Sequence, residues 1–247
     1  MLPKIWIFDT YTIFIMIGVI VCFIFAYLYF KKNKLGERYF YNLIFTACIT
    51  IIIGLISAVI FQTIFDMLKS NSTNPALSMT FFGGLAGGVI GFLLLYFFYL
   101  KKKEPQANLI KDIMIIAPAC ITVAHGFGRI GCFCAGCCHG IETDSIFGVT
   151  FPGMINPVYP TQLFEAFFLF ILSAILFFLA YKYRNLYTMP IYLAGYGVFR
   201  FMLEFLRGDD RGAYFLSLSP SQCFSIIAIF ISIGLSIYLY HWKKKNN

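Results

Sequence analysis

Thiol and imidazole side chains crowd one short part of the chain. The segment from His125 to Gly140 holds four cysteines and two histidines, namely Cys132, Cys134, Cys137, Cys138, His125 and His139. These are ligand types for zinc, but the cysteines lack the paired C-x2-C spacing of a tetrahedral zinc site. A disulfide is the second interpretation, since an extracytoplasmic compartment permits one. The third is a thiol beside Arg129, whose charge favours the thiolate. We expect no metal, and the sequence leaves a disulfide or a thiol role for Cys132 and Cys137 open.

Charged side chains also occur within long apolar segments. His125 and Arg129 are four residues apart and therefore share one face of a helix. A second polar stripe follows helical spacings through Tyr196, Arg200, Glu204 and Arg207. An Arg200–Glu204 pair that only neutralises itself is one interpretation of this stripe. That pair leaves Arg129 and Arg207 uncompensated, and arginines around a cavity suit a phosphate group. We therefore predict an anion-binding site.

Two further segments contribute groups to this predicted site. The segment Tyr159-Pro160-Thr161-Gln162 has the composition of a helix start with its proline in the first turn, and it places Gln162 and Glu165 one turn apart. Gly83 and Gly84 open another apolar segment, where free backbone amides can hold an anion. Close helix packing is the simpler interpretation of the glycines that follow, Gly87, Gly88 and Gly91.

The elements that position these residues are membrane helices. The chain of 247 residues is 60% hydrophobic and only 12% charged, which excludes an ordinary soluble domain. A span needs about 20 apolar residues, and about seven segments qualify. They are Tyr11 to Phe30, Tyr39 to Phe65, Met79 to Leu100, Ile110 to Ile130, Tyr159 to Tyr181, Tyr187 to Leu206 and Gln222 to Tyr240. We predict an all-α, polytopic bundle forming one domain over residues 1–247, and we interpret the first segment as a retained span rather than a cleaved signal peptide.

The basic residues indicate the orientation of the bundle. Most of the 19 Lys and Arg residues lie in connections that fall on one side of a seven-span protein, around Lys31, Lys101, Lys182 and Lys243. The positive-inside rule assigns that side to the cytoplasm. We expect the N-terminus outside, the C-terminus in the cytoplasm, and the cysteine-rich loop outside. The net charge of +8 thus reflects topology, and we expect no nucleic-acid partner.

The motifs resemble a known family. The chain is similar to bacterial prolipoprotein diacylglyceryl transferases in five ordered motifs: Gly83-Gly84, Gly128-Arg129-Ile130-Gly131-x-Phe133, Tyr159-Pro160-Thr161-Gln162-Leu163-Phe164-Glu165, Tyr196-Gly197-x-x-Arg200-Phe201-x-x-Glu204-x-x-Arg207 and Ser221-Gln222. The chain departs from the family pattern at four positions. Cys132 and Ala135 stand where the family has Asn, Cys137 stands where it has Glu, and Phe82 stands where it has His.

The resemblance implies a membrane enzyme of the bacterial cytoplasmic membrane. Its substrates would be phosphatidylglycerol and the lipobox cysteine of a prelipoprotein, and it would need neither a metal nor another cofactor. Arg129 and Arg200 would clamp the lipid phosphate, while Glu204 orients Arg200 and Tyr196 adds a hydrogen bond. Gln162, Arg207, Gly83 and Gly84 would complete the substrate site. His125 is the first candidate for accepting the thiol proton, since Phe82 stands at the usual His position.

Three alternatives remain at this stage. A divergent relative could transfer a lipid fragment to another acceptor, using Cys137 or Cys132 directly. A lipid or anion transporter could use the same arginines, although we would then expect discontinuous helices and two similar halves. A non-catalytic membrane scaffold held by metal or disulfide is the third alternative.

Overall fold

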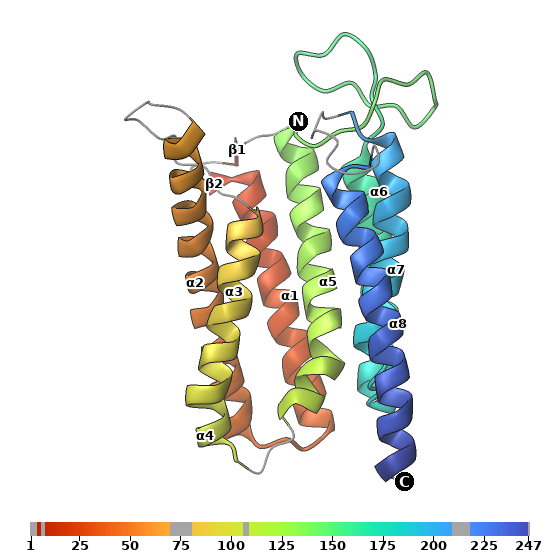
Figure 1. Ribbon diagram of the computed structural model, residues 1–247. Helices are drawn as coiled ribbons and strands as arrows, with labels where there is room; N and C mark the ends of the chain where they lie inside the picture. The colour runs from red at the N-terminus through yellow and green to blue at the C-terminus, as the bar shows by residue number, and fades with distance from the viewer. Residues whose placement is uncertain (1–3, 6–7, 70–80, 106–108, 209–217, 247) are drawn as a thin grey trace. The chain divides into compact units, whose positions relative to one another are not determined.

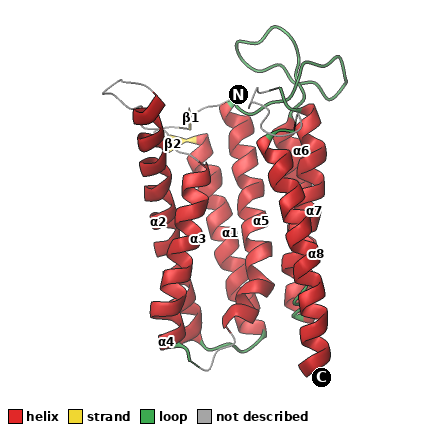
Figure 2. Cartoon of the chain, in the orientation of Figure 1, coloured by secondary structure: helices red, strands yellow, loops and turns green. Residues whose placement is uncertain are grey.

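Long apolar helices make up almost all of the protein. In the computed structural model, which describes residues 4–5, 8–69, 81–105, 109–208 and 218–246, red helices dominate the chain (Figure 2). Seven long helices lie in these residues: α1 Thr10–Lys32, α2 Glu37–Lys69, α3 Phe81–Leu95, α5 Leu109–Ala135, α6 Thr161–Tyr183, α7 Thr188–Leu203 and α8 Pro220–Asn246. The short elements are β1 Lys4–Ile5, β2 Phe8–Asp9, the π-helix η1 Tyr96–Leu100, α4 Lys101–Lys103 and the 3-10 helix η2 Glu204–Leu206. The prediction of an all-α helical bundle is confirmed.

Five of these helices are long and apolar enough to cross a membrane: Thr10–Lys32, Glu37–Ile64, Leu109–Ala135, Thr161–Tyr183 and Pro220–Lys245. Their outer faces carry exposed aromatic side chains, such as Phe167 at 70% and Phe230 at 69% exposure, as expected of a surface that faces lipid. The protein is therefore a polytopic membrane protein. The helix α3 runs on through η1 and α4, and α7 is 16 residues long. Seven crossings and their orientation remain predictions.

The chain folds as two compact units, so the single domain over residues 1–247 remains a prediction. Unit 2 comprises Asn33–Leu109 and is built on α2 and α3. The two helices approach so closely that a Cβ on Gly87 would collide with Ser57, and the Ser57 hydroxyl donates to the carbonyl of Gly83 at 2.8 Å. At the other end of these helices, the Asn42 amide donates to Glu104 at 2.7 Å.

Unit 1 comprises Met1–Lys32 and Ile110–Asn247 and contains α1, α5, α6, α7 and α8 (Figure 1). Its core includes Ala119, Leu172 and Leu176. Buried Asp112 accepts hydrogen bonds from Tyr29 at 2.9 Å and Arg184 at 2.6 Å, which ties α5 to α1 and to the end of α6. The helices α1, α5 and α6 are thus held by specific polar contacts as well as by apolar packing.

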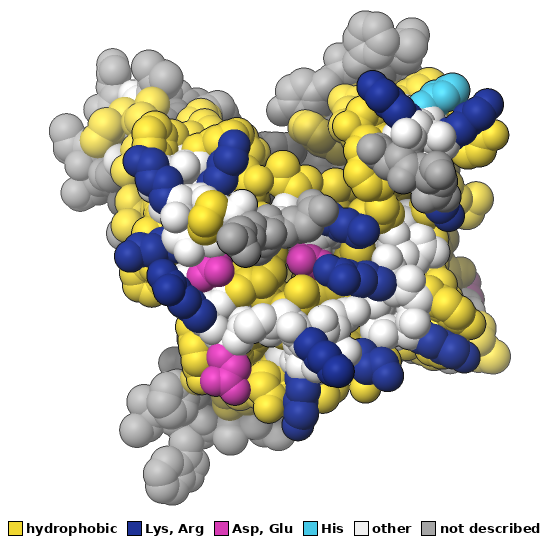
Figure 3. Space-filling model, turned by 90° about the horizontal axis from the view of Figure 1, so that it is seen from below, with side chains coloured by type: hydrophobic (Ala, Val, Ile, Leu, Met, Phe, Trp, Pro, Cys, Tyr) yellow, Lys and Arg dark blue, Asp and Glu magenta, His cyan; other side chains and the backbone are white. Residues whose placement is uncertain are grey.

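The two ends of unit 1 differ in character. The loop between α5 and α6 lies at the end where α1 begins, while α8 finishes at the opposite end (Figure 1). Viewed from that opposite end, Lys and Arg side chains are prominent (Figure 3), and the helix termini there carry Lys31, Lys32, Lys182 and Lys243–Lys245. These basic helix termini are the pattern on which the predicted orientation depends.

The end of α5 was predicted near Ile130, but the helix continues to Ala135. It stops with two hydrogen bonds of a Schellman motif, Gly136 N–H to Phe133 at 3.1 Å and Cys137 N–H to Cys132 at 3.2 Å. Gly136 has a φ of +72°, which glycine adopts without a Cβ clash. The helix therefore continues until the first glycine that takes the left-handed conformation, and Cys132 and Cys134 lie on the helix rather than in the loop.

The loop that follows is fastened to the rest of unit 1. Gly140 pairs with Arg207 in an isolated antiparallel bridge, and Ile141 N–H donates to Leu206 at 3.0 Å. Gly140 has no room for a side chain, since a Cβ would lie 2.8 Å from the Cβ of Tyr159. The loop returns at Pro160, which stands at the N-cap of α6 and not inside its first turn as predicted.

Candidate active site

The buried carboxylate of Glu165 is the centre of the polar cluster in unit 1. Its side chain is fully buried on α6. Arg129 Nε lies 3.0 Å from Oε2, and the Tyr196 hydroxyl donates to Oε1 at 2.8 Å. His125 Nε2 lies 3.6 Å from Oε1, and Arg200 Nη1 lies 3.9 Å from Oε2. Three helices, α5, α6 and α7, therefore converge on one negative charge.

The predicted relation of His125 to Arg129 is confirmed, because the two side chains are hydrogen-bonded. Arg129 Nε donates to His125 Nε2 at 3.2 Å, so this imidazole nitrogen is an unprotonated acceptor. The ring edge of His125 also contacts Tyr196, with centroids 5.3 Å apart. In this arrangement the lone pair that a general base needs is occupied by the guanidinium.

Arg200 is held at its other amino group by η2 and the start of α8. Nη2 lies 2.7 Å from Glu204 Oε2 and donates to the Ser221 hydroxyl at 3.0 Å. Glu204 in turn accepts from the Ser219 hydroxyl at 2.8 Å. Within the described part of the chain, Nη1 of Arg200 is buried without a hydrogen-bond partner. The Arg200–Glu204 pair thus exists, but it satisfies only one side of the guanidinium.

Two sequence expectations about charge need correction. Arg129 is not uncompensated, because Glu165 from the neighbouring helix is its ion-pair partner. Arg207 does not continue the helical stripe of Tyr196, Arg200 and Glu204. The helix ends first, and Arg207 has extended backbone angles, φ −83° and ψ 140°. Its buried guanidinium instead donates to the thiol sulfur of Cys138.

The remaining predicted residues have clear local partners. Gln162 is buried and its Nε2 donates to the carbonyl of Cys137 at 2.5 Å, while its Oε1 has no hydrogen-bond partner in the described residues. It therefore connects α6 to the cysteine loop. Gly83 and Gly84 lie in unit 2, where their small size lets α3 pack against Phe61 and Ala58 of α2. This packing explains both glycines, and their role in anion binding stays a prediction.

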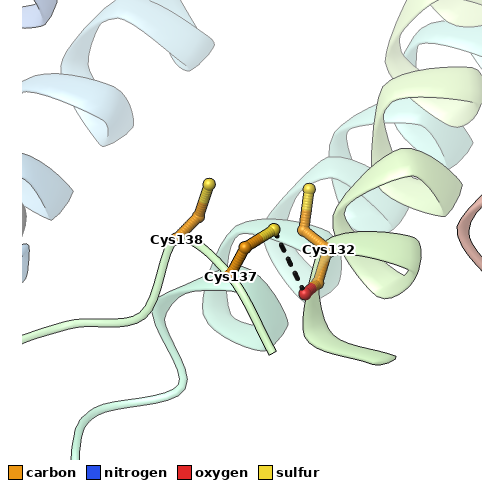
Figure 4. A group of neighbouring side chains, drawn as sticks. All are labelled: Cys132, Cys137 and Cys138. Carbon is orange, nitrogen blue, oxygen red and sulfur yellow. Dashed lines mark hydrogen bonds between the residues drawn. The ribbon is translucent and has the colours of Figure 1, made fainter. Parts of the chain in front are cut away.

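Three of the four clustered thiols come together. The Sγ atoms of Cys132, Cys137 and Cys138 all lie within 4.8 Å of one another (Figure 4). Every cysteine of the chain is a free thiol in the structure. The neighbouring Cys132 thiol and then the Arg207 guanidinium lower the pKa of Cys138 to about 5, whereas burial and the adjacent Cys138 raise the pKa of Cys137. Cys138 is therefore the thiol of this pair that ionises more readily.

A known protein family matches almost the whole chain. The sequence model described as prolipoprotein diacylglyceryl transferase matches residues 4–238. The chain belongs to the prolipoprotein diacylglyceryl transferase family. All of the residues that surround Glu165 lie within the part of the chain that matches this family.

Several named members of the prolipoprotein diacylglyceryl transferase family are similar over most of their length. The phosphatidylglycerol–prolipoprotein diacylglyceryl transferase 2 of Clostridium perfringens (strain 13 / Type A) is 37% identical over 246 residues, which cover 93% of this chain and 89% of that protein. The Clostridium tetani (strain Massachusetts / E88) phosphatidylglycerol–prolipoprotein diacylglyceryl transferase is 33% identical over 232 residues, covering 90% of each chain. A Helicobacter pylori (strain J99 / ATCC 700824) protein of that name is 31% identical over 171 residues, which cover 64% of this chain and 58% of that protein.

Sequence reasoning did not assign a role to Glu165, although it noted that Glu165 lies one turn from Gln162. The available signal was the one used for Arg200 and Glu204, because an ionisable side chain in an apolar span requires a partner. In this member of the prolipoprotein diacylglyceryl transferase family, that carboxylate is the common neighbour of Arg129, Arg200 and Tyr196.

Proposed function

We propose that this protein transfers the diacylglyceryl group of phosphatidylglycerol to the lipobox cysteine thiol of prelipoproteins, releasing glycerol phosphate. The observation that carries the proposal is the convergence of Arg129 and Arg200 on buried Glu165, inside the part of the chain that matches the transferase family. Two guanidinium groups near one another in a membrane bundle are suited to a phosphate whose acyl chains remain in lipid.

The free atoms of the two arginines support a phosphate clamp. In the described residues, the hydrogen bond and the ion pair of Arg129 both use Nε, so neither contact occupies Nη1 or Nη2. Arg200 has Nη1 buried and, within the described ranges of the chain, without a hydrogen-bond acceptor. Phosphate oxygens would supply the missing acceptors through charge-assisted hydrogen bonds. Glu204 and Ser221 hold Arg200 in place, and Glu165 limits the repulsion between the two cations.

The transfer step forms a thioether and breaks one ester bond. The thiolate sulfur of the acceptor attacks the glyceryl carbon that bears the phosphate, and the carbon–oxygen bond breaks with its electron pair on oxygen. Arg129 and Arg200 stabilise the negative charge that collects on the departing phosphate. The thiol proton leaves with a base and ends on the released glycerol phosphate, so no metal, nucleotide or redox partner is needed.

His125 is our candidate for accepting the thiol proton. Its Nε2 is engaged by Arg129 in the structure, so it becomes a base only when that contact is released. A phosphate that draws the Arg129 guanidinium away would release it. Phosphate binding and activation of the acceptor thiol are thus coupled through one hydrogen bond.

The other assignments follow from this reaction. We propose that the loop end of unit 1 faces outward, with the N-terminus outside and the C-terminus in the cytoplasm of a bacterium, so that an exported lipobox segment reaches the site there. Tyr196 supports Glu165, and Gln162 and Arg207 shape the loop next to it. Gly83 and Gly84 remain candidates for contact with the lipid.

The test is diacylglyceryl addition by the purified protein in nanodiscs that contain phosphatidylglycerol. A lipobox peptide is added, and its mass is followed with time. We expect addition by the parent chain and its loss in Arg129→Ala and Arg200→Ala. Arg38→Ala is the control, because this arginine side chain is 75% exposed on α2 and pairs with Glu104 within unit 2.

The outcomes separate the possible acceptors. If the folded protein consumes phosphatidylglycerol but adds nothing to the peptide, the acceptor is a molecule other than the lipobox cysteine. Full activity in both arginine variants would remove the phosphate clamp from the mechanism. Loss of activity in Arg38→Ala as well would mean that the assay reports general damage.

A further inference from the structure

Three thiols at the end of α5 have no part in the proposed transfer step. We propose that Cys132, Cys137 and Cys138 form a binding site for one divalent thiophilic cation of the zinc class. The site is adjacent to the arginine cluster, since Arg207 contacts Cys138, but its occupancy does not depend on the acceptor or lipid that the enzyme uses. The proposal departs from the sequence-based expectation of no metal, because the fold gathers three thiols that the C-x2-C rule does not relate.

The backbone brings these thiols together by a specific turn. The Schellman motif at the end of α5 folds Cys137 back onto the last helical turn, where its N–H donates to the carbonyl of Cys132 at 3.2 Å. The next residue, Cys138, has a φ of 64°, a left-handed conformation that is unfavourable for a residue with a Cβ atom. The turn thus explains why C-x4-C-C spacing, unlike the usual C-x2-C pairs, places three sulfurs in one group.

Side chains of α6 fix this turn from the other side. Gln162 Nε2 donates to the carbonyl of Cys137 at 2.5 Å, and the Thr161 hydroxyl donates to the carbonyl of Cys138 at 3.0 Å. Both α6 residues are buried. The left-handed residue is therefore held by two hydrogen bonds from a packed helix, which is the arrangement expected of a preorganised site.

The sulfur positions match a tetrahedral metal with one position left for solvent. Zinc–sulfur bonds of about 2.3 Å place tetrahedral ligand sulfurs about 3.8 Å apart. The three Sγ atoms already lie within 4.8 Å of one another, and Figure 4 shows them gathered above the end of α5. Small side-chain rotations would complete the site. Cys137 is exposed, so an ion and a water ligand have access.

Charge balance favours a divalent ion. Three thiolates and one divalent cation carry a net charge of −1, and the Arg207 guanidinium hydrogen-bonded to Cys138 compensates it. A monovalent cation bound to three thiolates would leave a net charge of −2 beside the same arginine. A disulfide would use two of the three sulfurs and leave the third without a role, whereas a metal ion uses all of them.

The experiment measures metal binding by the full chain in nanodiscs after anaerobic reduction. Zinc is added, excess ion is removed, and metal and protein are quantified. We expect one zinc per chain, and cobalt in its place should give sulfur-to-cobalt charge-transfer absorption. Cys132→Ser, Cys137→Ser and Cys138→Ser should each weaken zinc binding by at least about 100-fold. Cys134→Ser is the matched control, because it removes a thiol of the same segment outside the cluster, and it should bind zinc like the parent.

A labelling experiment on the unaltered protein tests the site without relying on variants. Protein isolated without reductant or chelator is treated with a maleimide, and modified cysteines are identified by mass spectrometry. We expect Cys132, Cys137 and Cys138 to be protected until a chelator is added. Protection that only a reductant removes would establish a disulfide and overturn the proposal. Absence of zinc from the reduced protein, or unchanged zinc binding in all three serine variants, would also overturn it.

Discussion

At the scale of the residue, the acidic groups determine what the arginines can do. Glu165 contacts Arg129 and Arg200, and Glu204 contacts Arg200 again, so two carboxylates balance two guanidinium groups. A neutral cluster costs far less to bury in a membrane protein than two isolated cations would. The site can therefore be stable before a phosphate arrives and still offer donors to it.

Replacing the Tyr196 hydroxyl tests the support of Glu165. Tyr196→Phe removes a 2.8 Å hydrogen bond to the carboxylate and keeps the ring against His125. Hydrogen bonds to charged groups contribute about 1.5–3 kcal/mol, so we expect kcat/KM to fall roughly 10- to 100-fold in the peptide assay. Glu165→Gln should lower kcat/KM further, because this change leaves both arginines without their shared counter-charge. Tyr192→Phe is the control, because this neighbouring tyrosine stacks on the Tyr196 ring. Unchanged kinetics in Tyr196→Phe would contradict a role of its hydroxyl in supporting Glu165.

His125 provides a second prediction at this scale. If it accepts the thiol proton, His125→Asn should lower kcat by about 10²–10⁴-fold while KM for phosphatidylglycerol changes little. Steady-state kinetics with lipid and peptide varied separately distinguish the two constants. A rate close to that of the parent would assign proton transfer to another group, and a rise in lipid KM alone would assign His125 to lipid binding.

At the scale of the element, glycines decide how closely helices pack. In unit 2, Gly87 faces Ser57 of α2 with no room for a methyl group, whereas a Cβ on the next residue, Gly88, would meet nothing within 4 Å. Two adjacent glycines of the same helix thus have different functions, and only one of them is required by packing.

The Gly87 and Gly88 pair gives a matched test. Gly87→Ala should destabilise the protein by about 1–3 kcal/mol, because backbone or Ser57 must move to relieve the collision. Gly88→Ala should leave stability unchanged or slightly raise it, since alanine is the better helix former. Thermal unfolding in one detergent compares the two variants. Equal melting temperatures for the two variants would contradict the prediction, because the collision at Gly87 would then carry no measurable cost in stability.

The sequence predicted elements better than it predicted their ends. Long apolar runs identify the helices because lipid permits little else, and each of the seven expected segments contains a helix in the structure. The end of α5 was predicted one turn too early, because the stopping signal lies in the backbone conformation of Gly136 and not in hydrophobicity. The same limit applies to the site. Helical spacing related Arg129 to His125, but the pairing of Arg129 with Glu165 joins two helices and depends on tertiary packing.

At the scale of the whole molecule, orientation is the property that connects the site to its substrate. A lipobox cysteine of an exported protein can be modified only if the loop end of unit 1 faces outward. The concentration of Lys and Arg at the opposite end agrees with that orientation (Figure 3).

Reporter fusions test the orientation. Green fluorescent protein fused after the C-terminus should fluoresce, and alkaline phosphatase fused there should be inactive. Alkaline phosphatase inserted at Ile146, which is 93% exposed in the loop between α5 and α6, should be active. The opposite pair of results would invert the proposed topology, and activity at both positions would change the number of crossings.

Nη1 of Arg200, which has no hydrogen-bond partner among the residues that the structure describes, links the lipid to the integrity of the fold. A ligand that binds only the folded chain raises its stability by RT ln(1 + [L]/Kd), about 2.7 kcal/mol at a hundredfold excess over Kd. Detergent-solubilised protein should therefore melt at a higher temperature with phosphatidylglycerol than with phosphatidylcholine, and Arg200→Ala should abolish the difference. Equal melting with the two lipids would contradict this. If the difference is found, the substrate is also a structural component of its own enzyme, and the lifetime of the protein depends on the anionic lipid content of the membrane that contains it.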